Sequence, residues 1–167
     1  RNLDYWDRLF LDAEELVKNS APKKKINDMV KKLAGIMVTA NKKLLSLAVN
    51  NFSLKELIDI KSRLIGTGFI GGKSVGMLLA RKIMSKKMAD WQALSEGHDS
   101  FYIGSDIFYS YIVQNRWWKL RIQQKTDEGY FVNAKILKEK MIYGVFSEDI
   151  MESFQQIIEY FGSSPII

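Results

Sequence analysis

The chain has 167 residues, of which 47% are hydrophobic and 26% are charged, with a net charge of +6. This length and composition predict about one globular domain with a sizeable core and exclude a disordered chain. No apolar run approaches the roughly 20 residues that a membrane-spanning helix needs, and the start carries no signal-peptide pattern. We therefore expect no membrane partner. The absence of cysteine excludes disulfides and thiolate metal sites or nucleophiles, which fits a cytoplasmic protein.

The first third of the sequence predicts helices. Apolar residues recur at helical spacing over residues 3–18, which indicates an amphipathic helix. A second helix is expected over residues 22–49, because its first residue is a proline, which suits a first helical turn. Ser53 followed by Glu56 forms a capping box, so a short third helix should cover residues 54–61.

Beyond this point short strands and helices alternate. Strands are expected at residues 63–66 and 101–103, with a glycine turn and a helix over residues 75–88 between them. Further helices are expected at residues 105–114, 133–143 and 148–161, while residues 117–124 are ambiguous. Residues 164–167 look like the beginning of a strand. Because a strand is an unusual end for a domain, and the first residue is not methionine, we expect a fragment of a longer protein.

Positive charge is concentrated in the predicted helices near the amino terminus. Between Lys18 and Lys61 there are ten lysines and three acids. A basic helix over residues 22–49 could bind nucleic acid or an acidic protein partner, so a non-catalytic binding module is one interpretation. The other interpretation is a solvated helix face opposite an apolar stripe. The lack of aromatic residues among these lysines argues against nucleic acid and favours the solvated face.

The most informative segment is GTGFIGGKSVG, at residues 66–76. Glycine allows a positive φ and a close approach of the backbone to a ligand. A lysine at a helix start adds positive charge where free amides and the helix dipole already favour an anion. The segment therefore predicts a phosphate-binding turn.

Taken from the residues alone, this turn has several interpretations. A P-loop requires a glycine separated by four residues from Gly-Lys-Ser, and that position holds Thr67. A dinucleotide fingerprint occurs at residues 66–71, but no apolar strand precedes it, and Asp90, at the expected distance, follows a helix. A third interpretation is a turn that merely joins a strand to a helix.

A larger set of segments resembles a known family. The segment GGKSVGM at residues 71–77, the helix that follows and the segment FYIGSDIF at residues 101–108 resemble the amino-terminal nucleotide-binding domain of pyruvate phosphate dikinase and phosphoenolpyruvate synthase. That family has a Gly-Gly-Lys-x-x-Gly-Leu segment, a helix, a short strand and a small polar pair that opens another helix. The resemblance covers residues 63–167, and Met77 stands where leucine is usual.

The resemblance implies a fold, a cofactor and a site. It implies an α/β, helix-rich chain with a helical extension over residues 1–61. Residues 62–167 would be the amino-terminal part of an ATP-grasp-like nucleotide-binding (PEP/pyruvate-binding) domain, which holds ATP and Mg²⁺ between two subdomains. Lys73 would contact the phosphate oxygens of ATP, with Gly71 and Gly72 giving close backbone approach. In the family, the phosphoryl group passes from ATP to a histidine on another domain of the same polypeptide and then to pyruvate, which gives phosphoenolpyruvate.

The same resemblance implies that the site is incomplete. The family's Arg-Ser-Ser strand, its adenine-contacting segment and its magnesium ligands would all lie beyond Ile167. We therefore expect this piece of an ATP-dependent phosphotransferase to be inactive alone and to bind ATP weakly or not at all. His98 is expected in a turn and not as the phosphorylated histidine. Trp117 and Trp118 are expected in packing contacts and not as a stacking platform.

Overall fold

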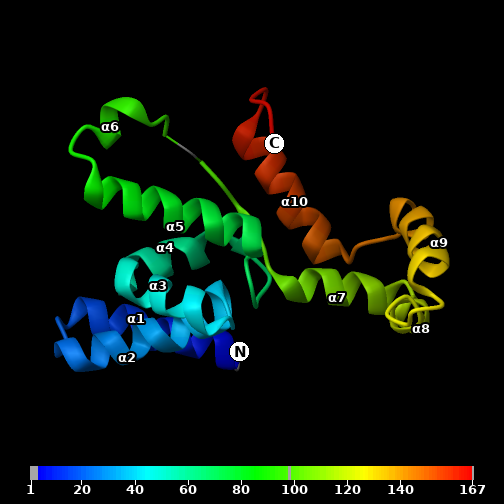
Figure 1. The fold of residues 1–167 in the computed structure, drawn as a ribbon, viewed down its shortest axis with the longest axis horizontal. Helices are drawn as coiled ribbons and strands as arrows, with labels where there is room; N and C mark the ends of the chain where they lie inside the picture. The colour runs from blue at the N-terminus through cyan, green and yellow to red at the C-terminus, as the bar shows by residue number, and fades with distance from the viewer. Residues whose placement is uncertain (1–3, 98, 167) are drawn as a thin grey trace. The chain divides into compact units, whose positions relative to one another are not determined.

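The computed structural model describes residues 4–97 and 99–166 (Figure 1). The chain divides into two compact units, Arg1–Ser105 and Asp106–Ile167. The boundary that we predicted between residues 61 and 62 lies within the first of these units.

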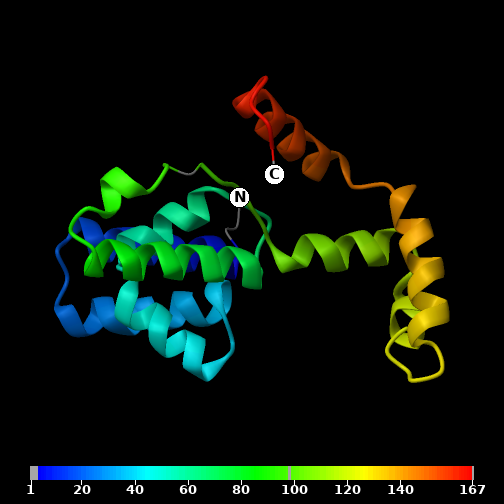
Figure 2. The ribbon, with the colours of Figure 1, turned by 45° about the horizontal axis from the view of Figure 1, so that its top comes forward.

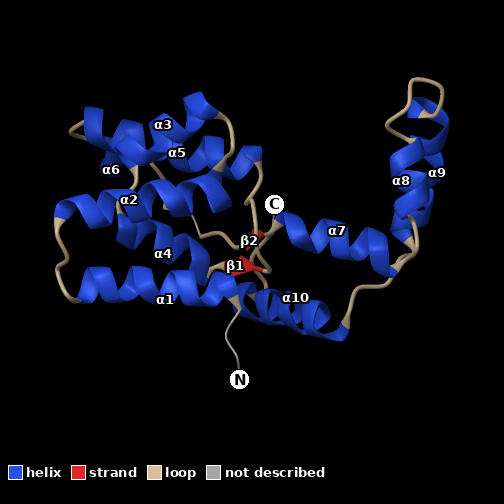
Figure 3. Ribbon diagram, turned by 90° about the horizontal axis from the view of Figure 1, so that it is seen from below, coloured by secondary structure: helices blue, strands red, loops and turns tan. Residues whose placement is uncertain are grey.

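The first unit is built from helices and a parallel pair of short strands. In chain order its elements are α1 (Tyr5–Lys18), α2 (Lys23–Leu33), the π-helical segment η1 (Ala34–Val38), α3 (Lys42–Asn51), α4 (Leu54–Ser62), β1 (Leu64–Ile65), α5 (Gly72–Lys87), α6 (Trp91–Leu94) and β2 (Tyr102–Ile103). The two strands lie side by side (Figure 3), with Leu64 opposite Tyr102 and Ile65 opposite Ile103. The prediction of a helix-rich α/β chain with these two strands is confirmed.

The core of the first unit lies where α4 packs against α1 and α2, and α5 packs against α3 (Figure 2). The apolar stripes of these helices meet there, and the side chains of Leu33, Met37 and Leu57 are completely buried. At the end of α3, the ammonium group of Lys86 from α5 donates to the carbonyl oxygens of Asn50 and Asn51, each at 3.3 Å. A lysine in this position satisfies carbonyls that the helix itself leaves without donors.

The prediction of a single helix over residues 22–49 is wrong. Helix α2 passes into η1, where the amide of Thr39 donates to the carbonyl of Ala34 (3.0 Å), and Thr39 itself is extended (φ −165°, ψ 146°). Asn41 then starts α3, because its side-chain oxygen accepts hydrogen bonds from the second and third amides that follow it. Apolar residues keep the helical spacing on both sides of the break, so this spacing alone predicted one continuous helix. Asn41 was the sequence signal for a new helix start.

The capping box predicted at the start of α4 is confirmed. The hydroxyl of Ser53 accepts from the amide of Glu56 (3.3 Å), and the Glu56 carboxylate accepts from the amide of Ser53 (2.8 Å). The same carboxylate forms an ion pair with Lys82 of α5. Burial alone would raise the pKa of Glu56, but the hydrogen bonds from Lys82 and Ser53 outweigh it and hold the pKa below its ordinary value of 4.5.

Glu56 should make the stability of the first unit depend on pH on the acid side. Because its pKa is lower in the folded state, its contribution is complete above the ordinary value of 4.5 and is lost as the pH falls through the folded pKa. The Glu56→Gln variant should therefore show a flatter acid dependence of the free energy of unfolding, measured by urea titration at a series of pH values. Glu14→Gln, on the exposed face of α1, is the matched control and should keep the wild-type slope. Equal acid slopes in all three proteins would contradict this role for Glu56.

The described residues of the second unit form helices without strands. These are α7 (Ser105–Gln114), which begins at the last residue of the first unit, α8 (Trp118–Gln123), α9 (Tyr130–Ile142) and α10 (Glu148–Phe161). The ambiguous segment 117–124 is therefore mostly helical. Residues 164–166 form no strand, contrary to the prediction, since this part of the chain offers them no strand to pair with, and Ile167 lies outside the described residues.

Tyr111 organises the packing of the second unit. Its ring stacks on Phe146 with the ring centroids 4.2 Å apart and meets the edge of Trp117 at 5.5 Å, while its hydroxyl donates to the carbonyl of Met141 (2.6 Å). The predicted packing role is thus confirmed for Trp117. The side chain of Trp118 is 46% exposed, although its ring contacts Tyr109.

Candidate functional site

The glycine turn between β1 and α5 depends on left-handed backbone at three positions. Gly66, Gly68 and Gly71 have φ values of 73°, 81° and 88°, a region in which only glycine is free of strain. Helix α5 begins directly after Gly71, which caps the helix without a side-chain hydrogen bond. The first amides of α5 are therefore not occupied by any capping side chain, and the positive end of the helix dipole lies at the same place.

Hydrogen bonds to two separate parts of the first unit hold this turn in place, and a third bond fixes the strands beside it. The amide of Phe69 donates to the hydroxyl of Ser105 (3.1 Å), and the amide of Ser105 donates back to the carbonyl of Phe69 (3.0 Å). The amide of Ile70 donates to the carbonyl of Met37, in η1, at 3.0 Å. The carboxyl end of β2 is joined to that of β1 by a bond from the amide of Gly104 to the carbonyl of Ile65 (2.8 Å). The turn is thus fixed before any ligand arrives.

The start of α5 is open on its outer side. A Cβ atom placed on Gly71 or Gly72 would meet no atom within 4 Å. The φ of Gly72 is also not positive, so neither packing nor backbone conformation demands a glycine there. Close approach by a ligand would explain it. Lys73 is exposed beside these glycines, and within the part of the chain that the structure describes its ammonium group has no ion-pair partner.

The structure therefore brings together the three predicted site residues, Gly71, Gly72 and Lys73, on one exposed helix start. Such an arrangement can bind an anion through backbone amides and one point charge. Sequence reasoning placed the start of this helix at Val75, so α5 begins earlier than predicted. The sequence prediction also placed Ser105 only at the start of the next helix and missed its bond to the turn. No local pattern reveals that bond, because its partners are 36 residues apart.

The other sequence candidates do not join this turn. The lysines of the predicted basic helix are exposed on two helices that the break at residues 39–41 separates: Lys23, Lys24, Lys25, Lys31 and Lys32 on α2, and Lys42 and Lys43 on α3. They therefore do not form one continuous basic face along a single helix. His98 lies outside the described residues.

Two absences among the described residues concern metal ions and membranes. No group of three or more histidine, aspartate or glutamate side chains comes together there in a way that could hold a metal ion. No helix of residues 4–97 or 99–166 has both the length and the apolar character that crossing a membrane requires.

No protein-family model matches this chain, and comparison with curated proteins and with solved structures gives no significant match. Function must therefore be inferred from the residues and geometry of the turn.

Proposed function

We propose that the glycine turn and Lys73 form the phosphate-binding wall of an ATP site in a phosphotransferase of the phosphoenolpyruvate synthase and pyruvate phosphate dikinase kind. The observation that carries this proposal is the exposed start of α5, where Gly71 and Gly72 leave open space beside Lys73. The order of the segments supports the same family, because the turn leads into a helix and β2 leads directly into α7.

The chemistry of phosphoryl transfer suits such a wall. This reaction requires mainly positioning of the phosphates and neutralisation of charge that spreads over their oxygens. In the proposed site, the first amides of α5 donate to a phosphate oxygen, and the Lys73 ammonium group supplies a positive charge beside it. ATP-grasp-like architecture and transfer to pyruvate are part of the proposal. Mg²⁺ belongs to the family's chemistry, but the described residues provide no carboxylate cluster for it, so we assign no step to it.

The proposal predicts that Lys73→Ala weakens ATP binding by about tenfold, or about 1.4 kcal/mol. The measurement is an NMR titration of the 167-residue chain with ATP, with expected shifts at the amides of residues 71–74 and a dissociation constant in the range of about 1 mM. Adenosine, which lacks phosphate, should leave these amides unchanged.

Lys87→Ala is the matched control, since Lys87 is an exposed lysine at the opposite end of the same helix. It removes the same charge from α5 and should leave ATP affinity within about twofold of wild type, as expected for a screened distant charge. If both variants lost the same ATP affinity, the loss would be due to the change in net charge alone, and the proposed site would be wrong. The same conclusion would follow if ATP bound this chain but shifted only amides outside residues 71–74.

A further inference from the structure

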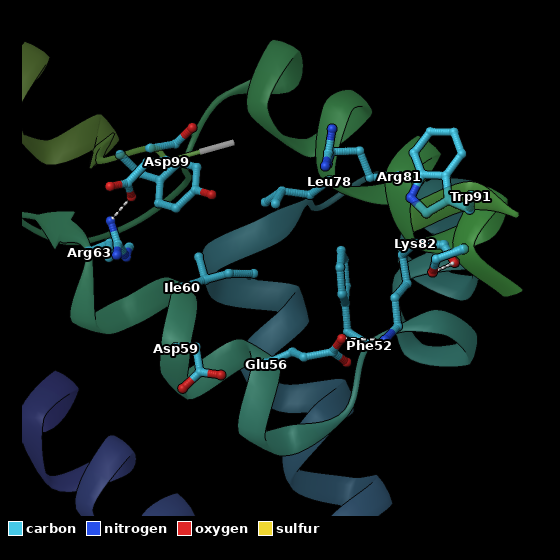
Figure 4. A pocket seen from close by; sticks show the side chains of 13 residues that line it. Phe52, Glu56, Asp59, Ile60, Arg63, Leu78, Arg81, Lys82, Trp91 and Asp99 are labelled. Carbon is cyan, nitrogen blue, oxygen red and sulfur yellow. Dashed lines mark hydrogen bonds and ion pairs between the residues drawn. The ribbon is translucent and has the colours of Figure 1, made fainter. Parts of the chain in front are cut away.

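A cavity of about 430 Å³ lies between α4, α5 and α6, at the half of α5 that is remote from Lys73 (Figure 4). This volume is within the range of pockets that hold small molecules, about 300–1,000 Å³. Leu78, Arg81, Lys82 and Ser85 contribute one face of α5 to its wall, since residues three and four apart share a helix face. The cavity belongs entirely to the first unit.

Much of the charge in this wall is neutralised within the wall itself. Lys82 is paired with Glu56 on one side, and Arg63 is paired with Asp99 on the other. These two ion pairs join α5 to α4 and the end of α4 to the segment that leads into β2. They hold the wall of the cavity in place and leave its interior open to a ligand.

Arg81 lines the cavity and belongs to neither of these two ion pairs. One of its terminal nitrogens donates to the carbonyl of Glu96 (2.8 Å), and its guanidinium carbon lies 5.8 Å from the ring centroid of Trp91. These two contacts orient the guanidinium group but use only one of its five N–H donors. Within the described part of the chain, no carboxylate forms an ion pair with it. A half-buried arginine held in this way is suited to a carboxylate or another flat anionic group.

Aromatic side chains form part of the remaining wall. Phe52 and Tyr102 are 7% and 5% exposed, and both face the cavity together with Trp91. The hydroxyl of Tyr102 has no hydrogen-bond partner among the described residues, and burial raises the pKa of this phenol, so it remains a donor at neutral pH. Asp59 is the acid of the wall outside both ion pairs, and its charge disfavours a ligand with several negative charges.

We propose that this cavity binds a small organic monoanion with a planar aromatic body. The anionic group of the ligand accepts from Arg81 and from the Tyr102 hydroxyl, while its planar body packs on Phe52 and Trp91. This site is distinct from the glycine turn and does not depend on the function proposed for it.

The test uses 2-naphthoate as the probe and two-dimensional amide NMR of the whole chain as the measurement. We expect saturable shifts at the Trp91 indole N–H and at cavity amides, with a dissociation constant of about 1 mM or lower. Arg81→Gln should weaken binding by at least about tenfold. Arg8→Gln, an exposed arginine on α1, is the matched control and should retain wild-type affinity. The neutral analogue 2-naphthylmethanol should bind more weakly than 2-naphthoate to the wild type and equally to both variants.

Loss of the bond to Glu96 could unfold the Arg81→Gln variant, which circular dichroism would show. Tyr102→Phe then carries the test, because it removes only the hydroxyl. It should weaken 2-naphthoate binding by at least about tenfold, since a hydrogen bond to a charged group contributes at least that factor. Three results would overturn the proposal: no saturable shift at the cavity, equal affinities in the variant and the Arg8→Gln control, or equal binding of the acid and the neutral alcohol.

Discussion

Replacing Leu57 by alanine should lower the free energy of unfolding of the first unit by about 2–5 kcal/mol. Leu57 is completely buried in α4, which packs against both α1 and α2, so the surrounding helices cannot close the space that its side chain leaves. A loss of this size is a large share of the total stability of a small unit, which is about 5–15 kcal/mol. Urea unfolding followed by circular dichroism measures it through the midpoint at constant slope.

Leu11→Ala is the matched control for this experiment. It makes the same substitution in a helix of the same unit, but the side chain of Leu11 is 45% exposed. Its effect should stay within about 0.5 kcal/mol. If both variants lost the same stability, α4 would not be the central helix of the core.

Replacing Gly68 by alanine should cost about 2–3 kcal/mol for two separable reasons. Gly68 has a φ of 81°, which strains any residue with a Cβ atom, and that atom would lie 2.5 Å from the hydroxyl oxygen of Ser105. The Ser105 side chain would have to move and release the amide of Phe69. Unfolding in urea gives the total cost, and the NMR shift of the Phe69 amide reports the broken bond.

The two contributions can be separated with a second substitution. In the Gly68→Ala/Ser105→Ala double variant the clash is gone but the φ strain remains, so its cost should be less than the sum of the two single variants. Gly76→Ala is the opposite control. Gly76 lies inside α5 with no atom within 4 Å of its Cβ position, so alanine there should stabilise the unit by about 0.5–1 kcal/mol. Strict additivity in the double variant would show that Ser105 and Gly68 do not interact.

The sequence predicted correctly those elements that depend on interactions between residues close together in the chain. The capping box of Ser53 and Glu56 depends on residues three apart, and the structure contains it as predicted. The same holds for the glycine turn, whose positive φ values follow from residue type. The break at Asn41 was missed because an apolar stripe satisfied the helical period on both sides of it.

Features that join distant segments were beyond such reasoning. The ion pairs of Glu56 with Lys82 and of Arg63 with Asp99 span 26 and 36 residues, and nothing local marks either partner. The cavity that they border was therefore not predicted, although each of its residues was visible in the sequence. For the glycine turn, the residue types were predicted, but the anchoring by Ser105 and Met37 required the fold.

The contact between η1 and the glycine turn restricts where this unit can gain or lose residues. The carbonyl of Met37 bonds to the amide of Ile70 before α5 begins, and Lys86 bonds to the end of α3 near where α5 finishes. The segments 37–51 and 70–86 are thus joined by hydrogen bonds at both ends. A residue inserted into or deleted from either segment would move the donor of one of these hydrogen bonds away from its acceptor. Sequences that share this unit should therefore vary in length outside these two segments, or change both together.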